Sequence, residues 1–454
     1  MTGEGPRRIG ALAVVFLATL LVGLASLRLD RQLGLLFGLT DEWFSLGLAL
    51  RATGTLGFDS QPSVLRPPGY PAFVAAVAWL SGADPGPVAG VMLAQCVLLA
   101  LSAALLTLWS SRFLKPLAAT AAGLLFGINP YSIVLIGLLN YSVLHLLAVI
   151  VACALLHAAL ETPDARRPMA LAGAAWGLAA LVRPTSLLAP AVLLLALRAL
   201  LRLSWRRALQ ATLVFAAAML GVIAPWTLRN YRVTGRLVPV NAQGQTALWG
   251  STVIRFGLDP NHFHWRRLYA DHFLPVFARV TGEPEYSYAT YVRNNLALED
   301  AFGGAARANL RAQPGVYAFN VARSFVAFGA HINSMLIDVF RVLQTGRLGW
   351  TGRAFEAYFG TLTLFAALGL GLALARRDPG LAAPLVGLLS FWVAHTLVYM
   401  DLMYYYVKLP FVFVFAFSFV SRLHERPANR AGRSLLWALT LATLVLTAAV
   451  LWPR

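Results

Sequence analysis

Two adjacent carboxylates are the first candidates for chemistry in this sequence. Asp41 and Glu42 form the only adjacent acidic pair that precedes Glu299, and they follow the first long apolar run. A membrane helix over that run would place the pair where the chain emerges into water. One interpretation is capping of the next helix, with Thr40 as N-cap and both acids favoured by the helix dipole. The other is a functional acidic pair, and the spacing leaves both open.

Cations form a second group of candidates. Arg66 begins the Arg-Pro-Pro string that follows the acidic pair in the first loop. Arg183 directly precedes Pro184, and Lys408 ends the tyrosine-rich run that begins at Asp401. Arginine is suited to phosphate because its planar guanidinium binds oxygen atoms in pairs. Arg and Lys also anchor membrane helices at the interface, where their charged ends reach water. Both interpretations are kept.

The composition identifies the class of protein that must position these residues. The chain has 454 residues, of which 59% are hydrophobic and 12% charged. A soluble domain carries about 25% charged residues. With several apolar runs of about 20 residues, the sequence predicts an all-α polytopic membrane protein. The net charge of +18 is spread over small Arg clusters between apolar runs, which is typical of topogenic signals and lipid contacts and not of nucleic-acid binding.

The apolar runs predict about 11 transmembrane helices, within a range of 10–13. Residues 69–82 are too short for a span and are predicted to form a surface helix in the first outer loop. The predicted spans are approximately 9–29, 88–110, 117–129, 131–159, 169–183, 184–201, 208–227, 354–375, 381–400, 405–421 and 434–452. Pro184 separates two of them because proline interrupts a helix.

This count puts the basic short loops on one side of the membrane. The positive-inside rule assigns that side, with the N-terminus, to the cytoplasm. The basic residues concerned are Arg7, Arg8, Arg112, Lys115, Arg166, Arg167, Arg198, Arg202, Arg206, Arg207, Arg376, Arg377, Arg422, Arg426, Arg430 and Arg433. The acidic pair and the two long loops, 30–87 and 228–353, then face away from the cytoplasm.

Three regions follow from this topology. Residues 1–227 are predicted to form an N-terminal transmembrane module that carries the first outer loop, 30–87. Residues 228–353 form a long extracytoplasmic loop, which is too long for a connector and is interpreted as a lid over a site at the outer leaflet. Residues 354–454 supply the C-terminal transmembrane helices. The amphipathic stretch from Pro314 to Gly329 is predicted to be a further surface helix.

Several strings in this sequence occur together in one known group. They are Asp41-Glu42 after the first helix, Arg66-Pro67-Pro68-Gly69-Tyr70-Pro71, Leu181-Val182-Arg183-Pro184, and Pro225-Trp226-Thr227-Leu228-Arg229-Asn230-Tyr231 followed by Leu248-Trp249-Gly250. The sequence resembles the bacterial protein O-mannosyltransferases and aminoarabinose transferases of glycosyltransferase superfamily C (GT-C). The resemblance extends from residue 1 to about residue 252 and more weakly beyond, and the Pro-Trp-x-x-Arg-Asn-Tyr string is its most specific part.

The resemblance implies a multi-pass enzyme of the bacterial inner membrane. Such an enzyme transfers a sugar from a polyprenyl-phosphate-linked donor to a lipid, glycan or protein acceptor on the extracytoplasmic side, with inversion. It implies Asp41 as general base and Glu42 as a supporting or alternative base. For the donor phosphate the candidates are Arg66, Arg183, Arg229 and Lys408, and for the substrate Tyr70, Asn230 and Trp249. No cofactor is implied and no metal-ligand spacing is present, although a divalent ion stays open.

The sequence departs from the group at three places. The neighbourhood of Tyr141 lacks an acid that the group often carries, Tyr406 stands where a basic residue is usual, and Ser251 replaces the usual Asn after Trp249-Gly250. These departures leave the sugar and the acceptor undetermined. Two alternatives are therefore kept beside the transferase: a lipid-sugar transporter or flippase, and a non-catalytic assembly partner on the same fold.

Overall fold

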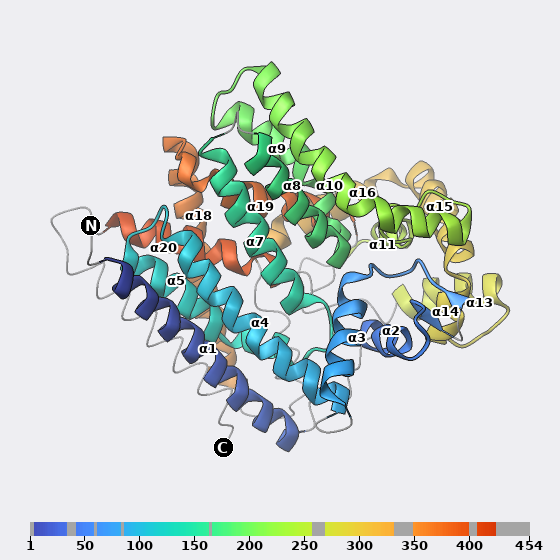
Figure 1. The fold of residues 1–454 in the computed structure, drawn as a ribbon. Helices are drawn as coiled ribbons and strands as arrows, with labels where there is room; N and C mark the ends of the chain where they lie inside the picture. The colour runs from blue at the N-terminus through green and yellow to red at the C-terminus, as the bar shows by residue number, and fades with distance from the viewer. Residues whose placement is uncertain are drawn as a thin grey trace.

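The computed structural model describes residues 4–33, 42–58, 61–82, 86–162, 166–256, 268–330, 348–398 and 406–423. Helices make up most of these residues, as the composition predicts (Figure 1). The only strands of the described residues form a hairpin, in which β1 (Gly57–Phe58) pairs antiparallel with β2 (Gln61–Pro62). The prediction of an all-α polytopic membrane protein is therefore confirmed at the level of fold class.

Six helices of the described residues are long and apolar enough to cross a membrane, or seven if one bent pair forms a single span. The predicted number of about 11 is thus not confirmed, and the predicted span 434–452 lies outside the described residues. The six are α1 (Glu4–Leu33), α4 (Gly86–Ser110), α7 (Ser142–Leu160), α10 (Trp205–Thr234), α18 (Leu348–Arg376) and α19 (Ala382–Leu397), the last with the short η3 (Pro379–Leu381) before it.

Shorter helices fill the remainder of the membrane bundle. The predicted surface helix forms α3 (Gly69–Ser81), and Pro184 ends α8 and begins a 3-10 turn, as expected. These helices are α2 (Glu42–Thr53), α3, α5 (Pro116–Ile128), α6 (Pro130–Gly137), α8 (Arg166–Val182), η1 (Pro184–Leu188), α9 (Ala189–Ala199) and α20 (Leu409–Leu423).

The single span predicted over 131–159 is wrong. The structure divides it into α6 and α7, with non-helical backbone from Leu138 to Tyr141. Asn129 caps α6 by accepting the backbone N–H of Ser132 at 3.1 Å, and α5 and α6 meet there at an angle of 43°. Hydropathy alone misses this break because the residues around it are as apolar as a span.

Gln95 of α4 explains how that break is tolerated inside the bundle. Its side-chain nitrogen donates to the carbonyl oxygens of Ile136 at 2.7 Å and Leu138 at 3.1 Å, and its oxygen accepts from the Tyr70 hydroxyl at 3.3 Å. Backbone carbonyls in the hydrocarbon region need such partners because no water is present to supply them. One buried amide thus holds α3, α4 and the end of α6 together.

The predicted lid is a folded helical unit in its described parts. Its elements are α11 (Gly244–Val253), the π-helical turn η2 (Leu268–Phe273), α13 (Leu274–Thr281), α14 (Tyr288–Arg293), α15 (Asn295–Ala312) and α16 (Pro314–Ala330). A second hydrophobic core, separate from that of the membrane bundle, lies within it around Phe273, Phe277 and Phe302. Helix α10 continues to Thr234, beyond the expected end at 227, with Pro225 inside it.

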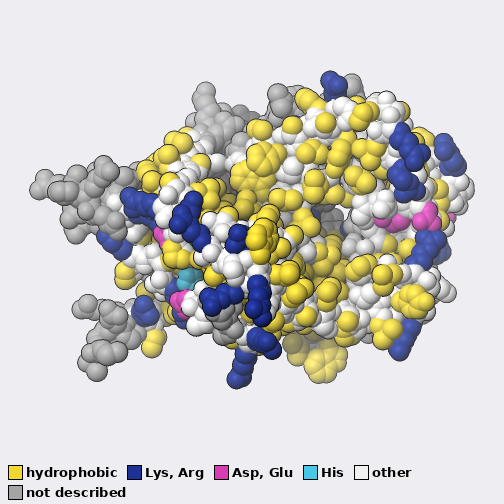
Figure 2. Space-filling view, turned by 90° about the horizontal axis from the view of Figure 1, so that it is seen from above, with side chains coloured by type: hydrophobic (Ala, Val, Ile, Leu, Met, Phe, Trp, Pro, Cys, Tyr) yellow, Lys and Arg dark blue, Asp and Glu magenta, His cyan; other side chains and the backbone are white. Residues whose placement is uncertain are grey.

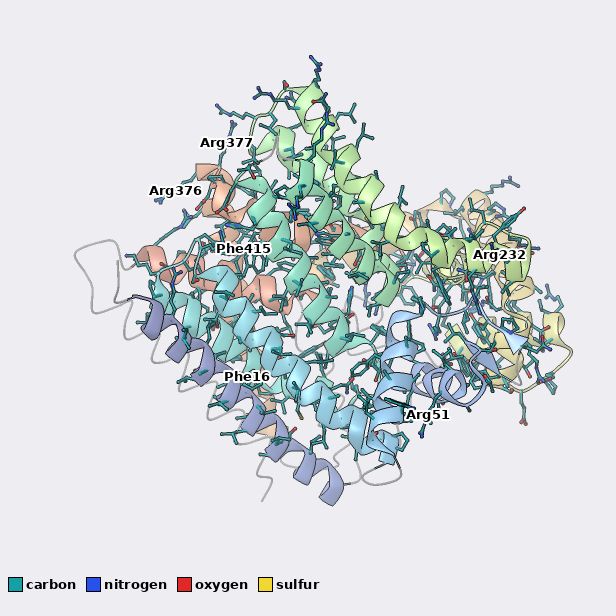
Figure 3. The ribbon with its side chains drawn as sticks, in the orientation of Figure 1. Phe16, Arg51, Arg232, Arg376, Arg377 and Phe415 are labelled. Carbon is teal, nitrogen blue, oxygen red and sulfur yellow. The ribbon has the colours of Figure 1, made fainter. Side chains whose placement is uncertain are left out.

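The short loops and the lid lie at different ends of the bundle. Arg112 pairs with Glu161 at 3.2 Å, and Arg422 in the last turn of α20 pairs with Asp378, so the loops after α4, α7 and α18 gather with the end of α20. Figure 3 shows Arg376 on the side opposite to Arg51 of α2. In Figure 2 a broad hydrophobic surface separates Lys and Arg side chains gathered toward the two sides.

We expect Gln95→Leu to lower the free energy of unfolding by about 2 kcal/mol or more, because it leaves buried carbonyls without a donor. The measurement is unfolding of the purified protein by a denaturing detergent. Ser102→Ala is the control on the same helix, since Ser102 bonds only to Leu98 one turn away. Equal stability of the two variants would contradict this account of the break.

Candidate functional site

An ion pair joins the two halves of the first outer loop. Glu42 begins α2, Arg66 lies just before α3, and one Arg66 nitrogen donates to Glu42 Oε2. The side chains are 27% and 14% exposed, so both charges are partly removed from water. The Arg66 guanidinium also lies over the Trp43 ring, 5.1 Å from its centroid. Two residues that the sequence indicated separately are thus in direct contact.

The lid completes this pair from two further segments. Arg66 Nη1 donates to Gln243 Oε1 at 2.6 Å, and the Tyr286 hydroxyl donates to Glu42 Oε1 at 2.8 Å. Burial and then the Glu42 charge raise the pKa of Tyr286 well above its usual range, so the hydroxyl stays a donor. Both carboxylate oxygens of Glu42 are therefore engaged.

Gln243 is itself held in position by the lid. It precedes α11, whose first turn is capped by the carboxylate of Glu299 from α15. Glu299 accepts from the backbone N–H groups of Gln245 at 2.8 Å and Thr246 at 3.1 Å. A carboxylate at a helix N-terminus satisfies unpaired N–H groups and is favoured by the helix dipole. This contact ties α15, α11 and Arg66 into one unit.

A row of aromatic rings leads from the ion pair toward Arg183. Trp43 contacts Tyr141 with ring centroids 4.6 Å apart, and Tyr141 contacts Tyr406 at 6.2 Å. The guanidinium of Arg183 lies 4.5 Å from the centre of the Tyr141 ring. Arg66 and Arg183 therefore lie over two rings that touch each other, Trp43 and Tyr141, and Tyr406 contacts the second of them.

The inner end of this row is hydrogen-bonded to the membrane helices. The Tyr406 hydroxyl lies 2.7 Å from His145 Nδ1, and His145 Nε2 lies 3.3 Å from the Ser186 hydroxyl. These contacts connect α20, α7 and η1. Lys408 follows Tyr406 by two residues, but its amine donates to the Phe328 carbonyl oxygen and lies over the Phe328 ring. Lys408 is thus directed at α16, away from the Arg66–Glu42 pair.

Arg229 and Asn230 have contacts of a different kind. Arg229 Nη1 donates to the Ser63 carbonyl oxygen at 2.6 Å, which pins the first outer loop to α10. The Asn230 amide donates to the carbonyl oxygens of Val238 and Val240 and so closes the turn after α10. The motif that carries the resemblance most specifically therefore organises backbone in this structure.

Tyr70 and Trp249 are also placed inside hydrophobic cores. Tyr70 is fully buried in the membrane bundle and bonds to Gln95. Trp249 is 4% exposed and packs in the lid core against Phe302, with ring centroids 4.5 Å apart. Neither ring faces the Arg66–Glu42 pair in the contacts found here, although both were predicted to bind substrate.

Asp41, the predicted general base, lies outside the described residues. Its neighbour Glu42 fixes where α2 begins, at the ion pair. Among the described residues no group of three His, Cys, Asp or Glu side chains could hold a metal ion. Sequence reasoning did not find Gln243 and Tyr286, because nothing in their local sequence distinguishes them from other polar loop residues.

Comparison with known proteins shows the fold. The chain is similar to the oligosaccharyltransferase AglB of Archaeoglobus fulgidus, in a structure with an inhibitory peptide and a dolichol-phosphate, with a TM-score of 0.55, 11% identity and coverage of 99% of this chain and 56% of that one. The apo form of the same oligosaccharyltransferase matches with a TM-score of 0.54 and 12% identity, over 97% of this chain and 55% of that one. The chain thus spans a little over half the length of these oligosaccharyltransferase chains.

The chain therefore shares the fold of this oligosaccharyltransferase, which is the fold that the resemblance predicted. ArnT from Cupriavidus metallidurans bound to undecaprenyl phosphate also matches, with 16% identity over 93% of this chain and 78% of that one, but its TM-score of 0.40 is too low to support an argument. No protein-family model matches the sequence. No curated protein sequence matches it either. The narrower branch within the superfamily stays a prediction.

The raised pKa of Tyr286 has a consequence for stability in alkali. A group whose folded pKa is raised contributes stability that is present below its unfolded pKa, about 10 for tyrosine, and is lost as the pH rises above it. We expect Tyr286→Phe to make the fall in unfolding free energy above pH 10 shallower by about 1.4 kcal/mol per pH unit. Detergent unfolding at a series of pH values measures this slope. Exposed Tyr231→Phe is the control, and identical slopes in both variants would contradict the Tyr286–Glu42 contact.

Proposed function

We propose that this protein is a membrane glycosyltransferase that takes its sugar from a polyprenyl-phosphate donor. One observation carries the proposal: Arg66 and Arg183 lie over the touching rings of Trp43 and Tyr141, directly beside the start of α2, where the acidic pair lies. The GT-C fold supports the same class of activity, since the similar AglB structure contains a dolichol-phosphate. The Trp43–Tyr141 pair with its two guanidiniums is called the cation-aromatic site below.

In the proposed reaction an acceptor hydroxyl attacks the anomeric carbon of the donor sugar. A bond forms between the acceptor oxygen and that carbon as the bond to the phosphate oxygen breaks on the opposite face, so the configuration inverts. The acceptor proton passes to a carboxylate, which we assign to Asp41. The lipid phosphate leaves as an anion, and Arg66 and Arg183 stabilise its developing charge.

Glu42 has a supporting role in this proposal. Its two oxygens accept hydrogen bonds from Arg66 and Tyr286. A proton taken from the acceptor hydroxyl would have to displace one of these two hydrogen bonds from the carboxylate. The carboxylate instead orients the Arg66 guanidinium and balances part of its charge while the site is empty of phosphate. Glu42 is therefore a positioning residue, and the base is its neighbour Asp41.

The other predicted residues divide into two groups in this proposal. Lys408 lies two residues from Tyr406 and stays a candidate for the lipid phosphate, although its amine bonds to Phe328 in this structure. We assign Arg229 and Asn230 to holding the first outer loop and the turn after α10. Tyr70 and Trp249 support the two hydrophobic cores and so act on the substrate only indirectly.

The orientation rests on charge. The short loops at the end opposite to the cation-aromatic site carry Arg112, Arg376 and Arg422, and the positive-inside rule assigns that end to the cytoplasm. The transfer site then faces the extracytoplasmic side of a bacterial inner membrane. A lipid, a glycan or a protein hydroxyl is an acceptor compatible with this side, and the sugar is set by residues around Tyr141 and Tyr406.

We expect Asp41→Asn to fold like the wild type and to reduce transfer by a factor of about a thousand or more, because an amide cannot take the acceptor proton. The measurement is release of undecaprenyl phosphate from a panel of undecaprenyl-phosphate sugars by the protein in membranes of its host. Near-normal release by the variant would remove Asp41 from the base role. Absence of release by the wild type, with retained lipid binding, would favour the transporter or the assembly partner.

We expect Arg66→Gln and Arg183→Gln each to weaken binding of undecaprenyl phosphate about tenfold or more, because each removes a charge-assisted contact to the phosphate. Titration of the purified protein with that lipid measures the dissociation constant. Arg112→Gln is the matched control, since Arg112 pairs with Glu161 at the opposite end of the bundle. Equal affinity in all three variants would return Arg66 and Arg183 to a purely structural role.

A further inference from the structure

A cavity lies at the end of the bundle that carries the short basic loops. It has a volume of about 430 Å³ and is lined by the loop between α4 and α5, the loop between α18 and α19, and the last turns of α20. Its polar lining consists of Lys115, Arg376, Asp378, Ser418, Ser421 and Arg422. Among the described residues, three cations and one carboxylate thus line this cavity.

Two buried polar atoms in this lining have no hydrogen-bond partner within the described part of the chain. They are Nη1 of Arg422 and the hydroxyl oxygen of Ser418. Ser418 is 1% exposed as a residue, and both side chains line the cavity. Buried donors are nearly always satisfied in folded proteins because leaving one unpaired costs free energy. These two donors indicate that the cavity holds a hydrogen-bond acceptor.

The one carboxylate of the cavity is already occupied. Asp378 Oδ2 accepts from Nη2 of Arg422, and Oδ1 accepts from the backbone N–H of Gly380 at 3.0 Å. This leaves Nη1 of Arg422 beside Lys115 and Arg376 for a further ligand. An acceptor in a cavity with this surplus of positive charge is an anion, and a phosphate group matches both the guanidinium and the hydroxyl donor.

This cavity is separate from the cation-aromatic site. Tyr406 lies just before α20 and Arg422 near its end, and a helix of that length extends about 20 Å. Figure 3 shows Arg376 at the opposite side of the molecule from Arg51 of α2. The two sites therefore bind different phosphates, if the transfer reaction takes place at the first.

We propose that this cavity is a binding site for a phosphate anion on the face of the membrane bundle that carries the basic loops. Phosphate of this kind comes either from the headgroup of an anionic membrane lipid or from a small molecule in solution. Arg422 donates through Nη1, Ser418 donates through its hydroxyl, and Lys115 and Arg376 supply further positive charge in the lining. Asp378 holds Arg422 in place, and its negative charge at the same time lowers the affinity of the cavity for the phosphate anion.

The test is calorimetric titration of the purified full chain in neutral detergent with three probes: short-chain phosphatidylglycerol, short-chain phosphatidylcholine and inorganic phosphate. We expect phosphatidylglycerol or inorganic phosphate to bind, and phosphatidylcholine to bind at least about tenfold more weakly than phosphatidylglycerol because its headgroup has no net charge. Binding of inorganic phosphate as tight as that of phosphatidylglycerol identifies a soluble source. Binding of phosphatidylglycerol alone identifies the lipid. Binding of neither overturns the proposal.

Variants separate this site from general attraction to a basic surface. Arg422→Gln should weaken binding about tenfold and Ser418→Ala about threefold, since they remove a charged and a neutral donor. Asp378→Asn should strengthen binding, although it breaks an ion pair, because it removes the competing charge. Arg112→Gln, outside the cavity on the same face, should change little. If Arg422→Gln fails to fold, the affinities of Ser418→Ala and Asp378→Asn for the phosphate probe decide the test. If these variants bind the probe with the same affinity as Arg112→Gln, the proposal is overturned.

Discussion

The partial burial of the Arg66 charge is the constraint on which the arrangement of the end of the bundle that carries Glu42 and Arg66 depends. A guanidinium removed from water needs a counter-charge and hydrogen-bond acceptors, and here Glu42 and Gln243 supply them. Glu42 in turn needs its second donor, Tyr286. Satisfying one cation therefore brings together the start of α2, the loop before α3, the start of α11 and the loop before α14. Loss of Arg66 would remove a charge and one of the contacts between these segments, while Asn241 and Ala242 still donate to the carbonyl oxygens of Leu65 and Val64.

The membrane bundle solves a similar problem with neutral groups. The break between α6 and α7 leaves carbonyl oxygens of the buried residues Ile136 and Leu138 without helical partners, and Gln95 donates to both. The break places Tyr141 between Trp43 and Tyr406, so that the aromatic row can form. A continuous helix over this region would leave no such position for the ring. The irregular backbone and the candidate site are thus parts of one feature.

The two ends of the bundle use arginine in different ways. At the lid end, Arg66 and Arg183 lie over aromatic rings, where they can release part of their contact to an incoming phosphate. At the other end, Arg422 is shared between a carboxylate and an open cavity. A chain with a net charge of +18 therefore holds its cations for at least three purposes in these proposals: orientation in the membrane, a lipid-linked donor, and a second anion.

The sequence by itself determined the class of protein, the places where Pro184 and the short apolar run 69–82 divide the helices, and the candidacy of Glu42, Arg66 and Arg183, because hydrophobic length, proline and charge act locally. Only the tertiary structure decided which partner each cation contacts. Arg66 and Gln243 are 177 residues apart, and Glu42 and Tyr286 are 244 apart. Arg229 has the same side chain as Arg66, yet it donates to the backbone carbonyls of Ser63 and Leu56 and to the neighbouring Asn230 side chain. Side-chain type defines what a residue can bind, and long-range packing selects the partner.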